Sequence, residues 1–457
     1  MSSETIEGKT GTSTVSDYWV ARREQLFWAS CISLIVTAMS FAIRGNLITP
    51  LSSQFNLSKE QIGLIVGTAF WGFALTTIIG GWLCDVVGMG RLLALAFVGH
   101  AIGILTTIFA NGFATLFLGT LAFGLANGLV EAACNPLIAT LYPEDKITRL
   151  NRFHMWFPGG IVIGGLLAYA IDKSGIGKST SPGQDHNWQI QMLTMVLPLI
   201  VYGFMFFGKK FPKTERSASG VSMAEMFKAC VTPLFLVFLV CMTLTSATEL
   251  VTGQWMTNIL TFTTQKDGIL FLVLITGLMA VGRGFAGNIV HRISPVAMLI
   301  GSATLSSLGL FLLTKAHDGV SATIASVIFA GGVCFFWPTM LGVVSERFPR
   351  SGALGLSIMG GVGMLSVSIG NAVVGKYYDQ GIVNYLGTDK LDTFKNALPG
   401  TPEAAKWAAA QSAGGISGLS ILVILPVILL FIFIAIFVYD KSRGGYKKEI
   451  LVQDQQA

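Results

Sequence analysis

The sequence predicts an all-α polytopic membrane protein with 12 transmembrane helices in two pseudo-symmetric six-helix bundles. Hydrophobic residues make up 52% of the 457 residues and charged residues only 12%, and the mean hydropathy is +0.67. A soluble domain carries about 25% charged residues. Long apolar runs, rather than short alternating segments, exclude a membrane β-barrel.

Twelve apolar segments approach or exceed the roughly 20 residues that a helix needs to cross a bilayer. They span residues 27–49, 62–84, 91–110, 114–142, 154–171, 190–207, 233–260, 269–290, 296–314, 320–343, 353–375 and 416–439. Residues 1–26 are polar and show no cleavable signal pattern, so the first segment is expected to be an uncleaved anchor.

The positive charges predict the orientation. Most of the 30 Lys and Arg residues fall in the two tails and in alternate loops. By the positive-inside rule, the tails 1–26 and 440–457 are expected in the cytoplasm, with the protein spanning the plasma (inner) membrane several times. The net charge of +6 is explained by this distribution and needs no nucleic-acid partner.

The chain divides into two halves of six spans. The basic segment 208–232 is the predicted cytoplasmic linker between an N-terminal bundle, 27–207, and a C-terminal bundle, 233–439. Asn135-Pro136 in the first half has a counterpart in Trp337-Pro338 of the second half. Weak internal symmetry of this kind is typical of transporters, whose sites lie between the repeats. The segment 376–415 is expected to form a long extracytoplasmic loop with a helical stretch, residues 401–412.

Glu131 is the main candidate site residue because it lies in a span that is otherwise free of charge. Ionisable groups inside a membrane are costly and usually serve the movement of protons, ions or substrate. Asn127 and Asn135 follow the same i, i+4 spacing, so the three side chains are expected to form one polar stripe that lines the pore. A structural ion pair with Arg44 of the first span is the alternative role for Glu131.

The seventh span provides further candidates. Glu249 is a second acid in an apolar segment and competes with Glu131 as the proton site. A Trp beside amide side chains suits a sugar ring, although Trp is also common at membrane interfaces. The candidate substrate contacts outside the first and fourth spans are Gln254, Trp255, Asn258, Trp337 and Asn371.

The loop Gly81-x-Leu83-x-Asp85-x-x-Gly88, followed by Arg91, resembles the loop 2–3 signature of the major facilitator superfamily. It departs from that signature at Val86, where the family usually has Arg. The resemblance covers nearly the whole chain and implies the major facilitator fold, with alternating access to a central site. It also implies that Asp85 acts in gating. The other expected gating residues are Arg91, Arg292, Glu346 and Arg347.

Two branches of the superfamily are similar to this chain. Glu131-Ala-Ala-Cys-Asn135-Pro136 resembles the E-T-A-A-N-P segment of the fucose permease group of sugar:proton symporters, but Asn46 stands where that group has an acid. Arg44-Gly45-Asn46 is similar to the R-x-N segment of the organic-anion branch. There, the Arg binds a substrate carboxylate and a helix 4 Glu carries the proton. Arg is suited to bidentate carboxylate recognition, although snorkelling to the interface is an alternative for Arg44.

The expected function is therefore proton-coupled symport of a monosaccharide or sugar acid, with Arg44 and Asn46 among the substrate contacts. The alternative is an organic-anion symporter or exchanger, for a hexuronate- or aldonate-like anion or a phosphorylated metabolite, in which Arg44 anchors the anion. We expect no enzymatic activity, no cofactor and no metal, because the six Cys are scattered without metal-ligand spacing. The expected partners are the substrate, protons and lipid, for a functional monomer.

Overall fold

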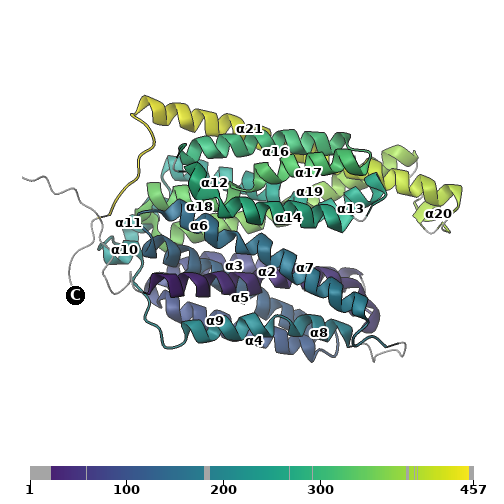
Figure 1. The fold of residues 1–457 in the computed structure, drawn as a ribbon, viewed down its shortest axis with the longest axis horizontal. Helices are drawn as coiled ribbons and strands as arrows, with labels where there is room; N and C mark the ends of the chain where they lie inside the picture. The colour runs from purple at the N-terminus through teal and green to yellow at the C-terminus, as the bar shows by residue number, and fades with distance from the viewer. Residues whose placement is uncertain are drawn as a thin grey trace, which may run out of the picture.

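The structure is a bundle of long helices (Figure 1). The computed structural model describes residues 22–57, 59–179, 186–266, 268–290, 292–387, 391–395, 397–398 and 400–451, and all regular secondary structure in these ranges is helical. Eleven helical segments within the described ranges are long and apolar enough to cross a membrane, and the shorter apolar helix Gly268–Gly284 adds a twelfth candidate. The prediction of an all-α polytopic membrane protein is confirmed.

The first half consists of six spans, two of which are interrupted. The uninterrupted helices are α2 (Arg23–Gln54), α3 (Lys59–Val86), α4 (Met89–Ile108) and α5 (Phe113–Leu141). The interrupted spans are α6 (Lys146–His154) with α7 (Trp156–Ser174), and α8 (Asn187–Leu193) with α9 (Val196–Phe206). Pro158 and Pro198 follow shortly after the two breaks, as expected because proline lacks the N–H that a helix interior needs.

The linker contains α10 (Glu215–Ala218) and α11 (Met223–Cys230). Helix α11 begins with a capping box: Glu225 N–H donates to Ser222 Oγ, and the Glu225 carboxylate accepts from Ser222 N–H. The backbone hydrogen bonds from Ser222 hold the pKa of the Glu225 carboxyl below its usual value.

The second half contains the remaining helices, both the spans and the short helices between them. They are α12 (Pro233–Ser246) with the π-helix η1 (Ala247–Val251) and α13 (Thr252–Thr264), α14 (Gly268–Gly284), α15 (Ala286–Val290), α16 (Pro295–Lys315), α17 (Gly319–Val333), α18 (Phe336–Arg347), the short 3₁₀-helix η2 (Pro349–Ser351), α19 (Gly352–Leu386), α20 (Asp392–Lys395) and α21 (Pro402–Ser442).

The expected loop 376–415 is largely helical. Helix α19 continues to Leu386, and the predicted stretch 401–412 is the beginning of α21, which then runs without a break into the last span. Thr401 caps α21 by accepting a hydrogen bond from Ala404 N–H. The predicted helical stretch 401–412 is present, whereas the continuation of α19 to Leu386 was not predicted, because the hydropathy pattern located only the apolar part of each helix. The extracytoplasmic placement of residues 376–415 stays a prediction.

Small residues bring the helices close together, as is usual in membranes. A Cβ on Gly160 of α7 would lie 3.0 Å from the Ile35 carbonyl oxygen of α2, and one on Gly361 of α19 would lie 3.2 Å from the Ala74 carbonyl oxygen of α3. The second contact joins the two halves. Gly160 and Gly361 therefore allow close packing between helices.

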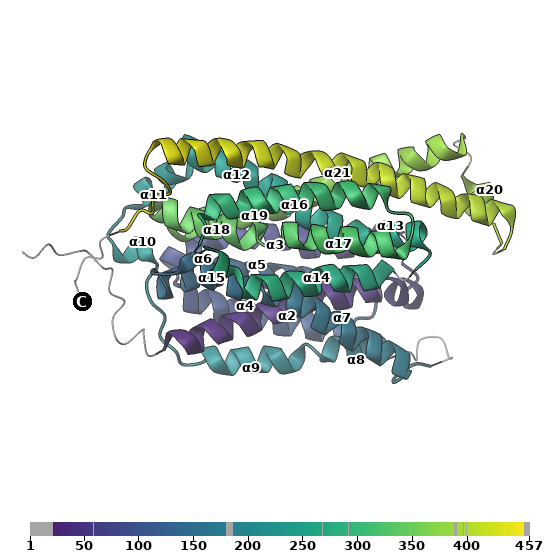
Figure 2. The ribbon, with the colours of Figure 1, turned by 45° about the horizontal axis from the view of Figure 1, so that its top comes forward.

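The two ends of the bundle differ. Helices α10 and α11 lie at one end, which we call the linker end, and α20 lies beyond the other end (Figures 1 and 2). Both ends of the described chain lie at the linker end: Arg23 pairs with Glu144 after α5, and Tyr446 contacts Glu346 of α18. An even number of spans returns the chain to the side on which it began.

Candidate functional site

Glu131 lies in a hydrogen-bonded group formed by α5 and α6. The Asn135 amide nitrogen donates to Glu131 Oε2 at 2.6 Å, and Asn135 Oδ1 lies 2.9 Å from His154 Nε2. Since the Asn135 nitrogen faces the carboxylate, its oxygen accepts from His154, which places a proton on Nε2. Glu131 is only 3% exposed. Glu131 and Asn135 of the predicted polar stripe are therefore in contact, and His154, which was not among the predicted site residues, joins them.

Arg283 and Glu249 form a second buried group in the other half. Arg283 Nη2 donates to Glu249 Oε1 at 2.7 Å, and Nε donates to the Cys334 carbonyl at 2.7 Å. Arg283 is 1% exposed, and Glu249 Oε2 is buried without a hydrogen-bond partner. Glu249 lies in the π-helix Ala247–Val251, a geometry often found at functional sites. Sequence spacing gave no sign of this turn.

Arg283 also joins the two groups. Its Nη1 donates to the His154 carbonyl oxygen at 3.0 Å. Hydrogen bonds, joined by the covalent bonds between the ring and the carbonyl group of His154, therefore connect both acids across the interface between the halves. We call this set, Glu131, Asn135, His154, Arg283 and Glu249, the charge network. The sequence pattern did not connect Arg283 with either acid.

Arg44 lies apart from the charge network. Its Nη1 donates weakly to the Thr120 carbonyl at 3.5 Å, and its guanidinium carbon is 4.6 Å from the centre of the Phe123 ring. Its Nε and Nη2 atoms are buried without a hydrogen-bond partner. The ion pair between Arg44 and Glu131, which was the alternative role for Glu131, is absent from the described residues, where Asn135 holds Glu131 instead.

Asn127 is separated from the other members of the predicted polar stripe. It is 0% exposed, its Oδ1 accepts from His100 Nε2 of α4 at 2.9 Å, and its amide nitrogen donates to Ser40 Oγ of α2 at 3.3 Å. The amide therefore holds α2, α4 and α5 together in this conformation. The side chain of Asn46 lies outside the described residues.

Several predicted substrate contacts gather in the second half. Trp255 Nε1 donates to Asn371 Oδ1 at 3.0 Å, and Asn258 Oδ1 accepts from the Tyr378 hydroxyl at 3.1 Å. The Trp255 and Tyr378 rings lie 5.3 Å apart. We call these four residues the aromatic-amide cluster; Tyr378 was missed because it lies in the segment that was expected to be a loop.

The two remaining candidates in this half differ from the aromatic-amide cluster. Gln254 is exposed. Trp337 is buried in α18, where its ring faces Gly363 of α19. A Cβ on Gly363 would lie 2.9 Å from this ring, so Trp337 contributes close packing between two helices in this structure.

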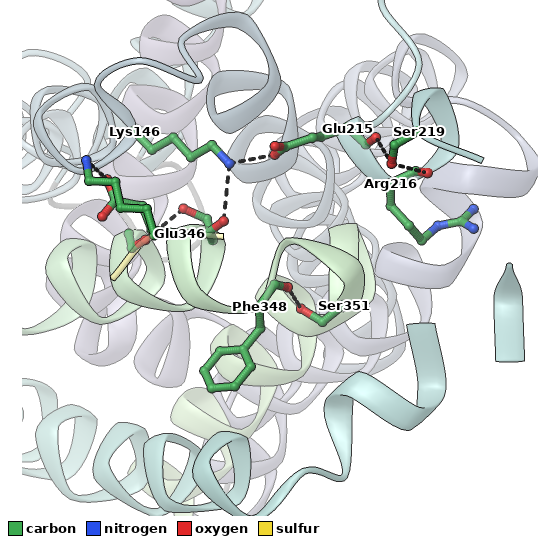
Figure 3. A network of polar contacts seen from close by, with 10 residues as sticks. Lys146, Glu215, Arg216, Ser219, Glu346, Phe348 and Ser351 are labelled. Atoms are coloured by element: carbon green, nitrogen blue, oxygen red, sulfur yellow. Dashed lines mark hydrogen bonds and ion pairs between the residues drawn. The ribbon is translucent and has the colours of Figure 1, made fainter. Parts of the chain in front are cut away.

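The linker end is closed by a contact that crosses the halves. Lys146 Nζ at the start of α6 donates to Glu215 Oε2 of the linker at 2.6 Å and to the Ser345 carbonyl of α18 at 3.2 Å (Figure 3). Lys146 is 3% exposed. A buried charge with two acceptors on different segments fixes their relative position. Sequence reasoning did not single out this residue.

Asp85 binds the linker rather than the adjacent loop. Its carboxylate accepts from Arg216 Nε at 2.9 Å and from the Thr214 hydroxyl. The second expected member of this loop, Arg91, is exposed, as is Arg292 in the second half. Neither has an acidic partner among the residues that the structure describes.

Glu346 and Arg347 hold the segment that follows α21. Glu346 accepts from the Tyr446 hydroxyl at 2.8 Å and from Lys448 Nζ at 2.7 Å, while Arg347 pairs with Asp440. Burial and the nearby Glu346 charge raise the pKa of Tyr446 well above its usual value. The end of α18 is therefore held to residues 440–448 by hydrogen bonds and ion pairs. No sequence pattern predicts this contact.

These features define a helical membrane protein with two bundles, a buried charge network between them and closure at one end. Such an arrangement is that of a secondary transporter. The sequence profile described as Major Facilitator Superfamily matches residues 30–371. The chain belongs to this superfamily of membrane transporters.

Individual similarities are distant. The Probable anion transporter 6, chloroplastic, of Arabidopsis thaliana is 26% identical over 178 residues, which are 37% of this chain and 32% of that protein. The Cis,cis-muconate transport protein of Acinetobacter baylyi is 24% identical over 184 residues, 40% of this chain and 41% of that protein. The aligned parts thus span less than half of each relative. The E. coli fucose:proton symporter FucP shares the fold, with a TM-score of 0.65, 15% identity and coverage of 88% of this chain and 98% of that chain.

Proposed function

We propose that this chain is a proton-coupled symporter of a small organic acid, either a sugar acid or another organic anion, that works by alternating access. The observation that carries the proposal is Arg44, whose Nε and Nη2 atoms are buried without a hydrogen-bond partner. A buried, unsatisfied charged donor is costly. A substrate carboxylate satisfies both nitrogens with the bidentate geometry that guanidinium favours.

Charge balance supports coupling to one proton. Arg44 and Arg283 contribute two positive charges, and Glu131 and Glu249 contribute two negative charges. Glu249 is compensated by Arg283 at 2.7 Å, which leaves Arg44 and Glu131 as separate opposite charges. A monoanion on Arg44 together with a proton on Glu131 neutralises both. Because an uncompensated charge in a membrane interior is expensive, the doubly loaded state has the lowest cost of reorientation.

The coupling role of Glu131 is tested with purified protein in liposomes. Glu131→Gln should lose accumulation driven by an imposed pH gradient, since the amide does not exchange a proton, and should retain exchange of substrate between the two sides. Glu144→Gln removes a carboxylate that is 55% exposed and serves as the control with wild-type accumulation. Normal gradient-driven accumulation by Glu131→Gln contradicts the coupling assignment.

The role of Arg44 is tested with substrate charge. Thermal-shift screening of uronates, aldonates and their neutral parent sugars identifies a ligand, because a bound ligand stabilises the native state by mass action. Arg44→Lys should weaken binding of the acid by at least about 10-fold, since lysine lacks the planar fork. Equal affinity of the wild type for acid and neutral sugar, or unchanged acid binding by the variant, overturns this part of the proposal.

A neutral monosaccharide is the second candidate substrate. The aromatic-amide cluster supports it, because the rings of Trp255 and Tyr378 suit the apolar face of a sugar and the amides of Asn258 and Asn371 suit its hydroxyls. The fold is shared with the fucose:proton symporter FucP. Under this alternative, Trp255→Ala abolishes ligand-induced stabilisation while Arg44→Lys leaves it intact.

The proposed location is the plasma (inner) membrane, with the linker end and both termini in the cytoplasm. The basic linker carries Lys209, Lys210, Lys213 and Lys228, in agreement with the positive-inside rule. Labelling in intact cells with a membrane-impermeant thiol reagent tests this orientation. A Cys introduced at Lys210 should react only after the cells are opened, whereas reaction in sealed cells reverses the assignment.

A further inference from the structure

A large apolar groove lies on the flank of the first half, away from the charge network. Its volume is about 1040 Å³, at the upper end of the range of ~300–1,000 Å³ for small-molecule sites. Its walls come from α4, α9 and the first residues of the linker. The aromatic side chains that line it are Phe97, Tyr202, Phe204, Phe206, Phe207 and Phe211.

The walls of the groove face the membrane. Phe204 is 75% exposed and Phe207 is 82% exposed, although both belong to an apolar span or its immediate end. Side chains of this kind at the surface of a transmembrane helix are in contact with lipid acyl chains. The groove therefore opens toward the hydrocarbon at the place where α9 leaves the membrane and the linker begins.

Three basic side chains line this groove without an acidic partner in the described ranges. Arg91, Lys209 and Lys213 all line it, all are exposed, and none pairs with an acidic side chain in the described ranges. Asp85 is the acid in the lining, but its side chain is 1% exposed and is neutralised by Arg216. The groove consequently has an excess of three positive charges beside an apolar trough.

The linker itself completes the groove. Phe211 packs on Phe206 with ring centres 5.6 Å apart and lies directly over Gly90, where a Cβ would meet its ring. Gly90 thus allows the linker to approach the start of α4 and brings Lys209 and Lys213 to the same site as Arg91. The three cations come from two segments that are more than a hundred residues apart in the sequence.

We propose that this groove binds an anionic phospholipid. The phosphate of the headgroup is held by Arg91, Lys209 and Lys213, and an acyl chain lies along Phe97, Phe204 and Phe207. Basic pockets between transmembrane helices at the membrane surface suit anionic headgroups, and each nearby Lys or Arg strengthens the attraction. The combination of charge and apolar area favours a lipid over a free polar anion, which gains nothing from the aromatic walls.

The charge requirement is tested with the full-length protein after delipidation in detergent. Dioleoyl-phosphatidylglycerol and dioleoyl-phosphatidylcholine are titrated, and bound lipid is counted by native mass spectrometry. Wild type should prefer phosphatidylglycerol by at least about 10-fold, and on the order of 100-fold if the contributions of the three cations add. The triple variant Arg91→Gln/Lys209→Gln/Lys213→Gln should lose this preference. Lys210→Gln/Lys228→Gln removes linker cations outside the groove and should retain the preference.

The apolar requirement is tested separately with the charges intact. Ala94→Trp fills the groove and should reduce phosphatidylglycerol binding, whereas Leu95→Trp alters the neighbouring exposed position and should not. Glycerol phosphate and inorganic phosphate should not compete. Equal binding of both lipids by the wild type, an unchanged preference in the triple variant, or full competition by free phosphate overturns the proposal. Size-exclusion profiles and circular dichroism establish that each variant is folded.

Discussion

The buried pair of Arg283 and Glu249 gives a quantitative prediction about the stability of the bundle. Arg283 donates to one carboxylate and two carbonyls, at 2.7, 2.7 and 3.0 Å, and is almost completely buried. Removing one partner of a buried pair leaves the other charge uncompensated, which costs about 3–5 kcal/mol. Individual hydrogen bonds between membrane helices are worth only ~0.6 to ~1.7 kcal/mol. The uncompensated charge is therefore the larger effect.

The two single variants should differ. Arg283→Gln strands the carboxylate and should lower the free energy of unfolding by about 3–5 kcal/mol. Glu249→Gln leaves Arg283 with its two carbonyl acceptors, so the loss should be smaller, about 1–3 kcal/mol. The double variant should be less destabilised than the sum of the two, because no isolated charge remains, with a coupling energy of roughly 1–3 kcal/mol.

The measurement is a double-mutant cycle on protein in one fixed detergent, unfolded with sodium dodecyl sulfate and followed by far-ultraviolet circular dichroism. The surface pair Arg23 and Glu144, also 2.7 Å apart but 26% and 55% exposed, provides the matched control cycle. Its coupling should lie between about 0 and 1 kcal/mol. A coupling energy of the buried pair that is no larger than that of the surface pair refutes the reasoning.

Three further predictions concern the segment that follows α21 and the packing of α16 against α17. Glu346→Gln should release the segment after α21, because its two hydrogen-bond partners there lose a charged acceptor, and limited trypsin digestion should show faster cleavage; unchanged cleavage contradicts this attachment. The pKa of Tyr446 is raised in the folded protein, so the stabilisation from its neutral hydroxyl is complete below about pH 10 and is lost as the pH rises further. Tyr446→Phe should remove this pH dependence of the free energy of unfolding, measured at alkaline pH. Gly309→Ala places a Cβ 2.5 Å from the backbone of α17 and should destabilise by about 1–3 kcal/mol, whereas Gly301→Ala meets open space and should be neutral or stabilising.

Much of the fold was predictable because crossing a membrane is a local property of composition. Each span needs enough apolar residues in sequence, and hydropathy measures this directly. Hydropathy did not locate the ends of α19 and α21 within residues 376–415, where both helices extend past their apolar parts. A helix outside the hydrocarbon is stabilised by its caps and by packing, as Thr401 shows, and these leave a much weaker signal in composition.

The candidate site was predictable only where its contacts are local. The Glu131–Asn135 contact follows from helical spacing, since residues i and i+4 are neighbours on one face. Hydropathy shows that each buried charge needs a partner but does not identify it. The alternative role for Glu131 named Arg44 as its partner, whereas the cation that belongs to the charge network is Arg283, which contacts the backbone carbonyl of His154. Such pairings depend on tertiary packing between the halves.

Under the coupling proposed for Glu131, the backbone contact at His154 is the structural link between the acid and the closed linker end. The Asn135 side chain links Glu131 to the His154 ring, and the carbonyl of the same histidine is held by Arg283 from the opposite half. Helix α6, which ends at this residue, begins with Lys146, whose ammonium joins the linker to α18. Both ends of one nine-residue helix therefore contact the opposite half. The proposed coupling therefore needs no path longer than this helix: loss of the His154 contact should weaken the Lys146 contact at the linker end.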